Sequence, residues 1–174
     1  RYVEFPVYSL GFREHLVFQE KGANDSETEF ANYLRYGGMP ATYHFDQNED
    51  VIYQYMSSVY STILLKDIVK RHSVRNVPLL ENIGRYLFDN IGNVMSAKRI
   101  ADYLKSQRLN VGVDTVQNYL GYFTDALLAH KVQRYDIKGR RLLEIHEKYY
   151  VNEICLRHAL LGSREADIGG TLEN

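Results

Sequence analysis

Cysteine is almost absent from this sequence of 174 residues, in which Cys155 stands alone. A single thiol excludes an intramolecular disulfide and any zinc site built from several thiolates. We expect Cys155 to be a small buried residue, because a free cysteine is usually a packing residue. The six histidines never fall at positions i and i+4 of one helix, so no metal site is predicted.

Long apolar runs are also missing. No run approaches the roughly 20 residues that a helix needs to cross a bilayer. No charged-then-apolar leader stands at the N-terminus. We therefore expect a soluble, cytoplasmic protein with no membrane partner. Because the sequence begins at Arg1 without a methionine, we expect it to be an excerpt of something longer.

The sequence lacks the common catalytic motifs. It contains no GxxxxGK[ST] loop for phosphate, no HExxH and no GxSxG. Asp67 and Glu81 are carboxylates on expected helices, and we interpret them as solvated helix charges. No catalytic residue is assigned to this chain.

The stretch from Ser96 to Val151 has the clearest pattern. Ser96 is a typical N-cap, and residues 97–105 carry apolar side chains on one face, which predicts a first helix. A break at residues 109–113 separates it from a second helix, which Asp114 or Thr115 would cap. The expected inward stripe of this second helix is Val116, Leu120, Phe123 and Leu127.

Two alternating segments follow the second helix. Residues 129–137 and 141–145 flank Lys138-Gly139-Arg140, a pattern typical of a β-hairpin. Helix, turn, helix and hairpin is the order of a winged helix-turn-helix. The predicted fold class is mainly α, with a helical lid subdomain followed by a winged helix-turn-helix and its small β-hairpin wing.

Charge is distributed unevenly along the chain. Residues 96–148 carry ten Lys/Arg and six Asp/Glu, whereas residues 1–95 carry nine and twelve. A basic excess in the helix-turn-helix segment is compatible with DNA as a partner. The residue types that can hold phosphates or contact base edges there are Lys98, Arg99, Gln117, Asn118, Tyr122, Lys138, Arg140 and Arg141.

The other segments alternate between expected helices and breaks. We expect a strand at residues 2–7, a third short strand at 149–151, and helices at 10–18, 27–36, 51–71, 76–90 and 152–161. The sharpest break is Gly37-Gly38 followed by Met39-Pro40. Glycine there would let the backbone approach a ligand closely, and as an isolated pattern the segment is a helix stop.

Several ordered motifs together resemble a family of prokaryotic AAA+-type ATPases with a C-terminal DUF4143 domain. The resemblance runs through Arg1 to Glu14, Tyr36 to Pro40, Lys66-Asp67-Ile68, Arg134 to Gly139, and Lys148-Tyr149-Tyr150. It departs from the family after the wing, where Glu153 and Cys155 replace the usual aspartate and glycine.

The resemblance implies a position within a longer ATPase. Residues 1–8 would be the last strand of a missing core, 9–74 the lid, 75–151 the winged helix, and 152–174 the start of a truncated C-terminal region. Gly38, Met39 and Pro40 would contact nucleotide. ATP and Mg²⁺ would be bound by the parent protein and not by this fragment alone, and the partners would be the missing P-loop and C-terminal domains.

Three functions remain open from the sequence. The first is the lid and winged helix of a nucleotide-dependent switch, in which this fragment does not hydrolyse ATP and the parent protein does. The second is a winged-helix DNA-binding protein or transcriptional regulator. The third is a protein-protein adaptor that binds neither DNA nor nucleotide.

Overall fold

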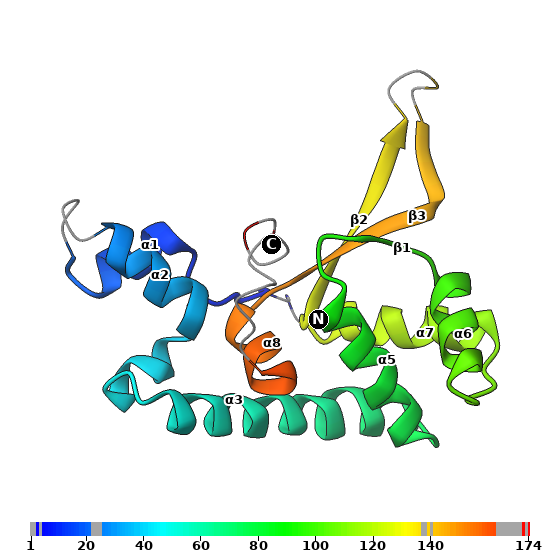
Figure 1. Ribbon diagram of the computed structural model, residues 1–174, viewed down its shortest axis with the longest axis horizontal. Helices are drawn as coiled ribbons and strands as arrows, with labels where there is room; N and C mark the ends of the chain where they lie inside the picture. Colours follow the sequence, from blue (N-terminus) through cyan, green and yellow to red (C-terminus); the bar gives the residue numbers. More distant parts are fainter. Residues whose placement is uncertain are drawn as a thin grey trace.

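The computed structural model describes residues 3, 5–21, 26–136, 139, 141–162, 172 and 174. It is mainly helical, as predicted, and it contains a small three-stranded antiparallel sheet where the sequence predicted a β-hairpin. Figure 1 shows the arrangement, in which a long helix runs beneath the molecule and connects a pair of helices at one end to a helical group with the sheet at the other.

The N-terminal part consists of α1 (Phe12–Phe18), α2 (Ser26–Tyr36) and a 3-10 helix (Pro40–Phe45). Residues 3 and 5–8 form no strand, so the prediction of a strand at residues 2–7 is wrong for the part that the structure describes. They have no hydrogen-bonded neighbour, and the side chains of Val3, Phe5 and Val7 are exposed.

The long helix is α3 (Glu49–Ile63), which continues through a π-helical segment (Leu64–Val69) into α4 (Lys70–His72). The helix expected at 51–71 is thus present, with a local change of pitch. Asn48 caps its start by accepting a hydrogen bond from the Val51 amide at 3.3 Å. Leu64 and Ile68 of the π-helical segment are both buried.

The second group contains α5 (Val77–Asp89), β1 (Val94–Met95), α6 (Ala97–Ser106), α7 (Val113–Asp125), β2 (Ala129–Asp136) and β3 (Arg141–Val151). In the sheet β3 lies between β1 and β2, antiparallel to both. The sequence did not predict β1. The expected separate strand at residues 149–151 is the end of β3.

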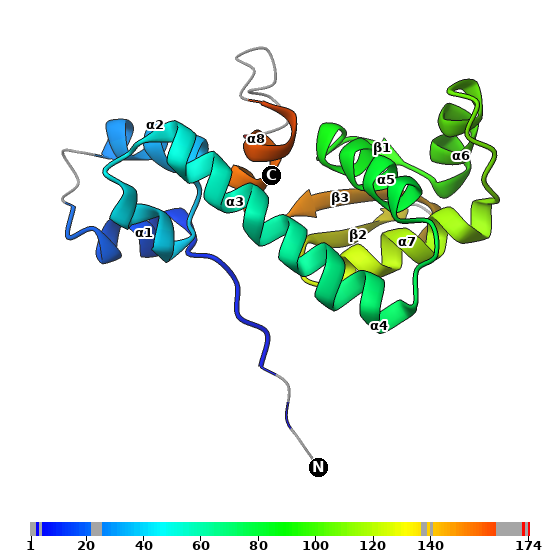
Figure 2. The same cartoon turned by 90° about the horizontal axis from the view of Figure 1, so that it is seen from below.

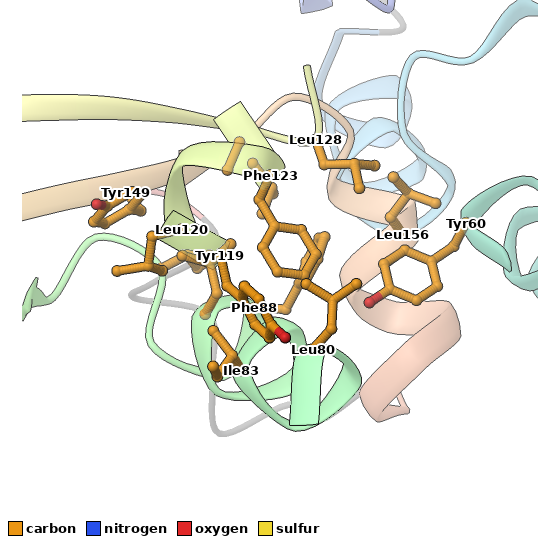
Figure 3. Close-up of a cluster of buried hydrophobic side chains, with 14 of the residues drawn as sticks. Tyr60, Leu80, Ile83, Phe88, Tyr119, Leu120, Phe123, Leu128, Tyr149 and Leu156 are labelled. Atoms are coloured by element: carbon orange, nitrogen blue, oxygen red, sulfur yellow. The ribbon is translucent and has the colours of Figure 1, made fainter. Parts of the chain in front are cut away.

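The last described helix, α8 (Ile154–Leu161), packs against α2, α3 and α5 and so joins the two ends of the molecule. Figure 3 shows the main core, where side chains from α3, α5, α7 and α8 meet. Gly84 allows this packing, because a Cβ there would lie 2.7 Å from the Tyr60 hydroxyl and 2.8 Å from the Phe123 ring.

Candidate functional site

The turn at Gly37 and Gly38, which follows α2, is in contact with distant parts of the same chain. Gly37 ends the helix with φ +75°, as its missing side chain allows. The Gly38 amide donates to the Glu153 carboxylate at 3.1 Å, and the Gly38 carbonyl accepts from the Leu10 amide at 2.9 Å. The sequence predicted that these glycines would let the backbone approach a ligand, and in the structure Glu153 and Leu10 of the same chain make the close contacts.

Space at this turn is extremely tight. A Cβ on Gly37 would lie 1.6 Å from Oε1 of Glu153, and one on Gly38 would lie 2.0 Å from the Leu10 carbonyl oxygen. Met39 is half-buried and Pro40 is exposed at the start of the 3-10 helix. The assignment of Gly38, Met39 and Pro40 to nucleotide contact stays a prediction.

Glu153 is the residue that organises this junction, and only 4% of it is exposed. It caps α8 by accepting from the Cys155 amide at 3.1 Å while also accepting from Gly38. Burial raises the pKa of Glu153 to about 7, although the amide donors of Cys155 and Gly38 oppose the rise. Sequence reasoning noted Glu153 only as a departure from the family pattern and missed both its role as the cap of α8 and its partner 115 residues away.

A cavity of about 380 Å³ opens between α1, α2 and the 3-10 helix. In its wall the buried His15 ring contacts Glu29 at 3.1 Å and the Tyr43 hydroxyl at 2.7 Å. The Lys21 ammonium lies 3.6 Å from the other oxygen of Glu29. Both ring nitrogens of His15 are engaged, so this residue packs and offers no free imidazole nitrogen to a ligand. Across the described ranges, no three His, Cys, Asp or Glu side chains are arranged to hold a metal ion.

The predicted DNA-contacting residues of α6 lie on its surface. Ser96 caps the helix as expected, accepting from the Arg99 amide at 3.2 Å. Ile100 and Leu104 are buried, which leaves Lys98 and Arg99 exposed. Tyr103, which the spacing placed on the same face as Ile100 and Leu104, is exposed, so the sequence predicted the inner face of this helix only in part.

Helix α7 starts slightly earlier than predicted. Gly112 occupies the N-cap position, so the expectation of Asp114 or Thr115 as the cap is wrong. Val116, Leu120 and Phe123 are buried as expected, whereas Leu127 lies beyond the helix end with φ +54°.

The outer face of α7 presents polar side chains. Gln117 and Asn118 are exposed. Tyr122 is half-buried because its ring stacks on His72 of α4, with centroids 3.8 Å apart and an interplanar angle of 13°. Sequence reasoning missed this contact, because nothing in the pattern pairs residues 72 and 122.

The hairpin of β2 and β3 projects away from the helices (Figure 1). Two of the predicted contacts at its tip, Lys138 and Arg140, lie outside the described residues. Arg141 begins β3, and the structure describes its backbone alone. At the base of the hairpin, Lys131 pairs with Glu147 at 2.7 Å.

Residues 27–167 match a protein family described as a domain of unknown function, DUF8612, and the chain belongs to this family. An uncharacterised protein of Haemophilus influenzae is 30% identical over the whole chain, which spans 44% of that relative. The uncharacterised protein MJ1544 of Methanocaldococcus jannaschii is 26% identical, and the chain spans 40% of it. No solved structure matches.

These matches correct the family expected from the sequence. The matching family is DUF8612 and not the AAA+-type family with a DUF4143 domain, and neither relative carries an ATPase name. The motifs that carried the resemblance were short and dispersed, and in one of them the Gly38 amide bonds to Glu153 of the same chain. Among the described residues, no helix is both long and apolar enough to cross a membrane.

Proposed function

We propose that residues 77–151 form a winged helix-turn-helix that binds duplex DNA. The order α5, β1, α6, α7, β2, β3 supports this, because it places two consecutive helices before a projecting hairpin whose second strand pairs with β1. The observation that carries the proposal is the outer face of α7. Gln117 and Asn118 are exposed there, opposite the buried Val116 and Leu120.

In this geometry α7 is the recognition helix. A helix of this kind lies in the major groove, and amide side chains such as Gln117 and Asn118 pair with the N6 and N7 groups of adenine. The preceding helix of such a motif crosses the phosphate backbone. Lys98 and Arg99 are exposed in the first turn of α6, where they can hold phosphates.

The sequence of the hairpin adds to this proposal. The sequence between the two strands is basic, with Lys138 and Arg140 in it and Arg141 at the start of β3, and a basic wing can contact the neighbouring stretch of DNA backbone. The alternative of nucleotide-coupled movement, with ATP and Mg²⁺ held by a longer protein, stays a prediction. The adaptor alternative is an outcome of the experiment below.

Binding of the full 174-residue chain to short duplexes, measured by fluorescence anisotropy across salt concentrations, tests the proposal. We expect the logarithm of the affinity to fall linearly with the logarithm of salt concentration, because phosphate contacts release counterions. Changing Lys98 and Arg99 to Ala should make that slope shallower. Absence of salt-dependent binding would contradict the proposal and favour a protein-protein adaptor.

Selection from a pool of random duplexes tests the role of α7. The wild-type chain should enrich a motif, and Gln117→Ala and Asn118→Ala should relax it at individual positions by about 1–3 kcal/mol each. Gln54→Ala is the matched control, because Gln54 is an exposed glutamine on α3. An identical motif with all three variants would show that α7 does not contact the bases.

A further inference from the structure

The recognition helix of the proposed module lacks cations of its own. α7 contains Asp114 and Asp125 and no lysine or arginine. Two carboxylates repel the phosphate backbone, which carries one negative charge for about every 1.7 Å of duplex. A duplex held against α7 therefore needs positive charge from a neighbouring element.

Positive charge is concentrated where the long helix ends. Lys66, Lys70, Arg71 and Arg75 fall within ten residues that contain one acid, Asp67, and these four basic residues are here named the basic flank. All four are exposed. Within the part of the chain that the structure describes, none of them forms an ion pair, so their charges are directed to solvent.

The basic flank lies beside the outer face of α7. His72 follows Arg71 directly, and its ring stacks on Tyr122, which is one helical turn from the exposed Asn118. Figure 2 shows α4 next to α7, on the side of α7 that faces away from α6. The aromatic stack thus fixes the end of the long helix next to the surface that presents Asn118.

We propose that the basic flank binds the phosphates of duplex DNA that lies against α7. This inference rests on the proposed function and adds to it a second element that the sequence placed outside the winged helix. Arginine suits the role because its planar guanidinium can grip a phosphate through two hydrogen bonds. The negative end of the helix dipole also attracts Lys70 and Arg71, but it accounts for neither Lys66, one turn earlier, nor Arg75, beyond the helix end.

The test compares single arginine variants of the full chain in the anisotropy titration described above. Arg71→Ala and Arg75→Ala should each make the salt slope shallower by about 0.9, because each removes one phosphate contact. At ~0.1 M salt this corresponds to an affinity weaker by up to about tenfold. Arg71→Lys should keep most of the slope, because it retains the charge.

Arg13→Ala is the matched control, since Arg13 is an exposed helical arginine at the opposite end of the molecule. It should leave slope and affinity unchanged. If the wild-type chain binds duplex while Arg71→Ala and Arg75→Ala match it in both slope and affinity, the basic flank does not bind phosphates. That result would refute this inference and leave the proposed function standing. If the wild-type chain shows no salt-dependent binding, both proposals fail.

Discussion

The Glu153 junction makes a quantitative prediction about stability and pH. Its carboxyl group has a pKa of about 7 in the folded chain, compared with an ordinary value of 4.5, because burial disfavours the charged form. The folded state therefore binds the proton more tightly than the unfolded state does. Stability from this group is complete at low pH and is lost as pH rises from 4.5 towards 7.

The magnitude follows from the difference between the two pKa values. At about 1.4 kcal/mol for each pH unit, ionisation of Glu153 should lower the free energy of unfolding by roughly 3 kcal/mol between pH 4.5 and pH 7. Glu153→Gln keeps the shape and an oxygen acceptor for the Gly38 and Cys155 amides but cannot ionise. The variant should lack this component of the pH dependence.

Urea unfolding followed by circular dichroism at pH 5 and pH 8 measures the effect. The informative quantity is the stability of the wild type minus that of Glu153→Gln, because this difference removes contributions from other titrating groups. We expect it to become less favourable to the wild type at pH 8 by most of the 3 kcal/mol. Glu27→Gln, which changes an exposed glutamate on α2, should show no such trend. A difference that is constant with pH, or that favours the wild type at pH 8, would refute the reasoning.

Four further predictions concern packing and ionisation. Gly38→Ala should destabilise the fold by at least ~1–3 kcal/mol in urea unfolding, because its Cβ would meet the backbone oxygen of Leu10 at 2.0 Å. Gly121→Ala should instead stabilise α7 by about 0.5–1 kcal/mol, since the site is open and alanine is the better helix former. Phe123→Ala should cost about 3–5 kcal/mol through the cavity that it leaves in the core. Burial lowers the pKa of His158. The stabilisation of the fold by the neutral ring is therefore present above the unfolded pKa of 6.5 and declines on acidification. An NMR titration of the ring should show a pKa below 6.5.

The helices were predictable because their signals are local. Ser96 caps α6, and Asn76 caps α5 with Pro78 in the first turn, where its missing amide costs nothing. The stripe of Val116, Leu120 and Phe123 identifies the buried face of α7 from spacing alone. Each of these statements depends on residues within a few positions of one another.

The contacts that build the candidate sites could not be predicted in the same way. The Gly38–Glu153 hydrogen bond and the His72–Tyr122 stack each join residues at least 50 positions apart, which no periodicity connects. β1 was missed because two residues are too few to show alternation, and their pairing with β3 depends on the whole sheet. The family resemblance was wrong because it rested on short, dispersed motifs, whereas the family match extends over residues 27–167.

The way α8 is held bears on any movement within this chain. Its cap residue Glu153 is bonded to Gly38 in the N-terminal part, and the Arg157 side chain donates to the Phe88 carbonyl of α5 at 3.2 Å. A rotation of the α5–α7 group relative to α1 and α2 would have to break one of these buried contacts. A buried donor or acceptor that loses its hydrogen-bond partner costs about 1–3 kcal/mol, and more where the group is charged. We therefore infer that the proposed DNA-binding face and the N-terminal helices move together.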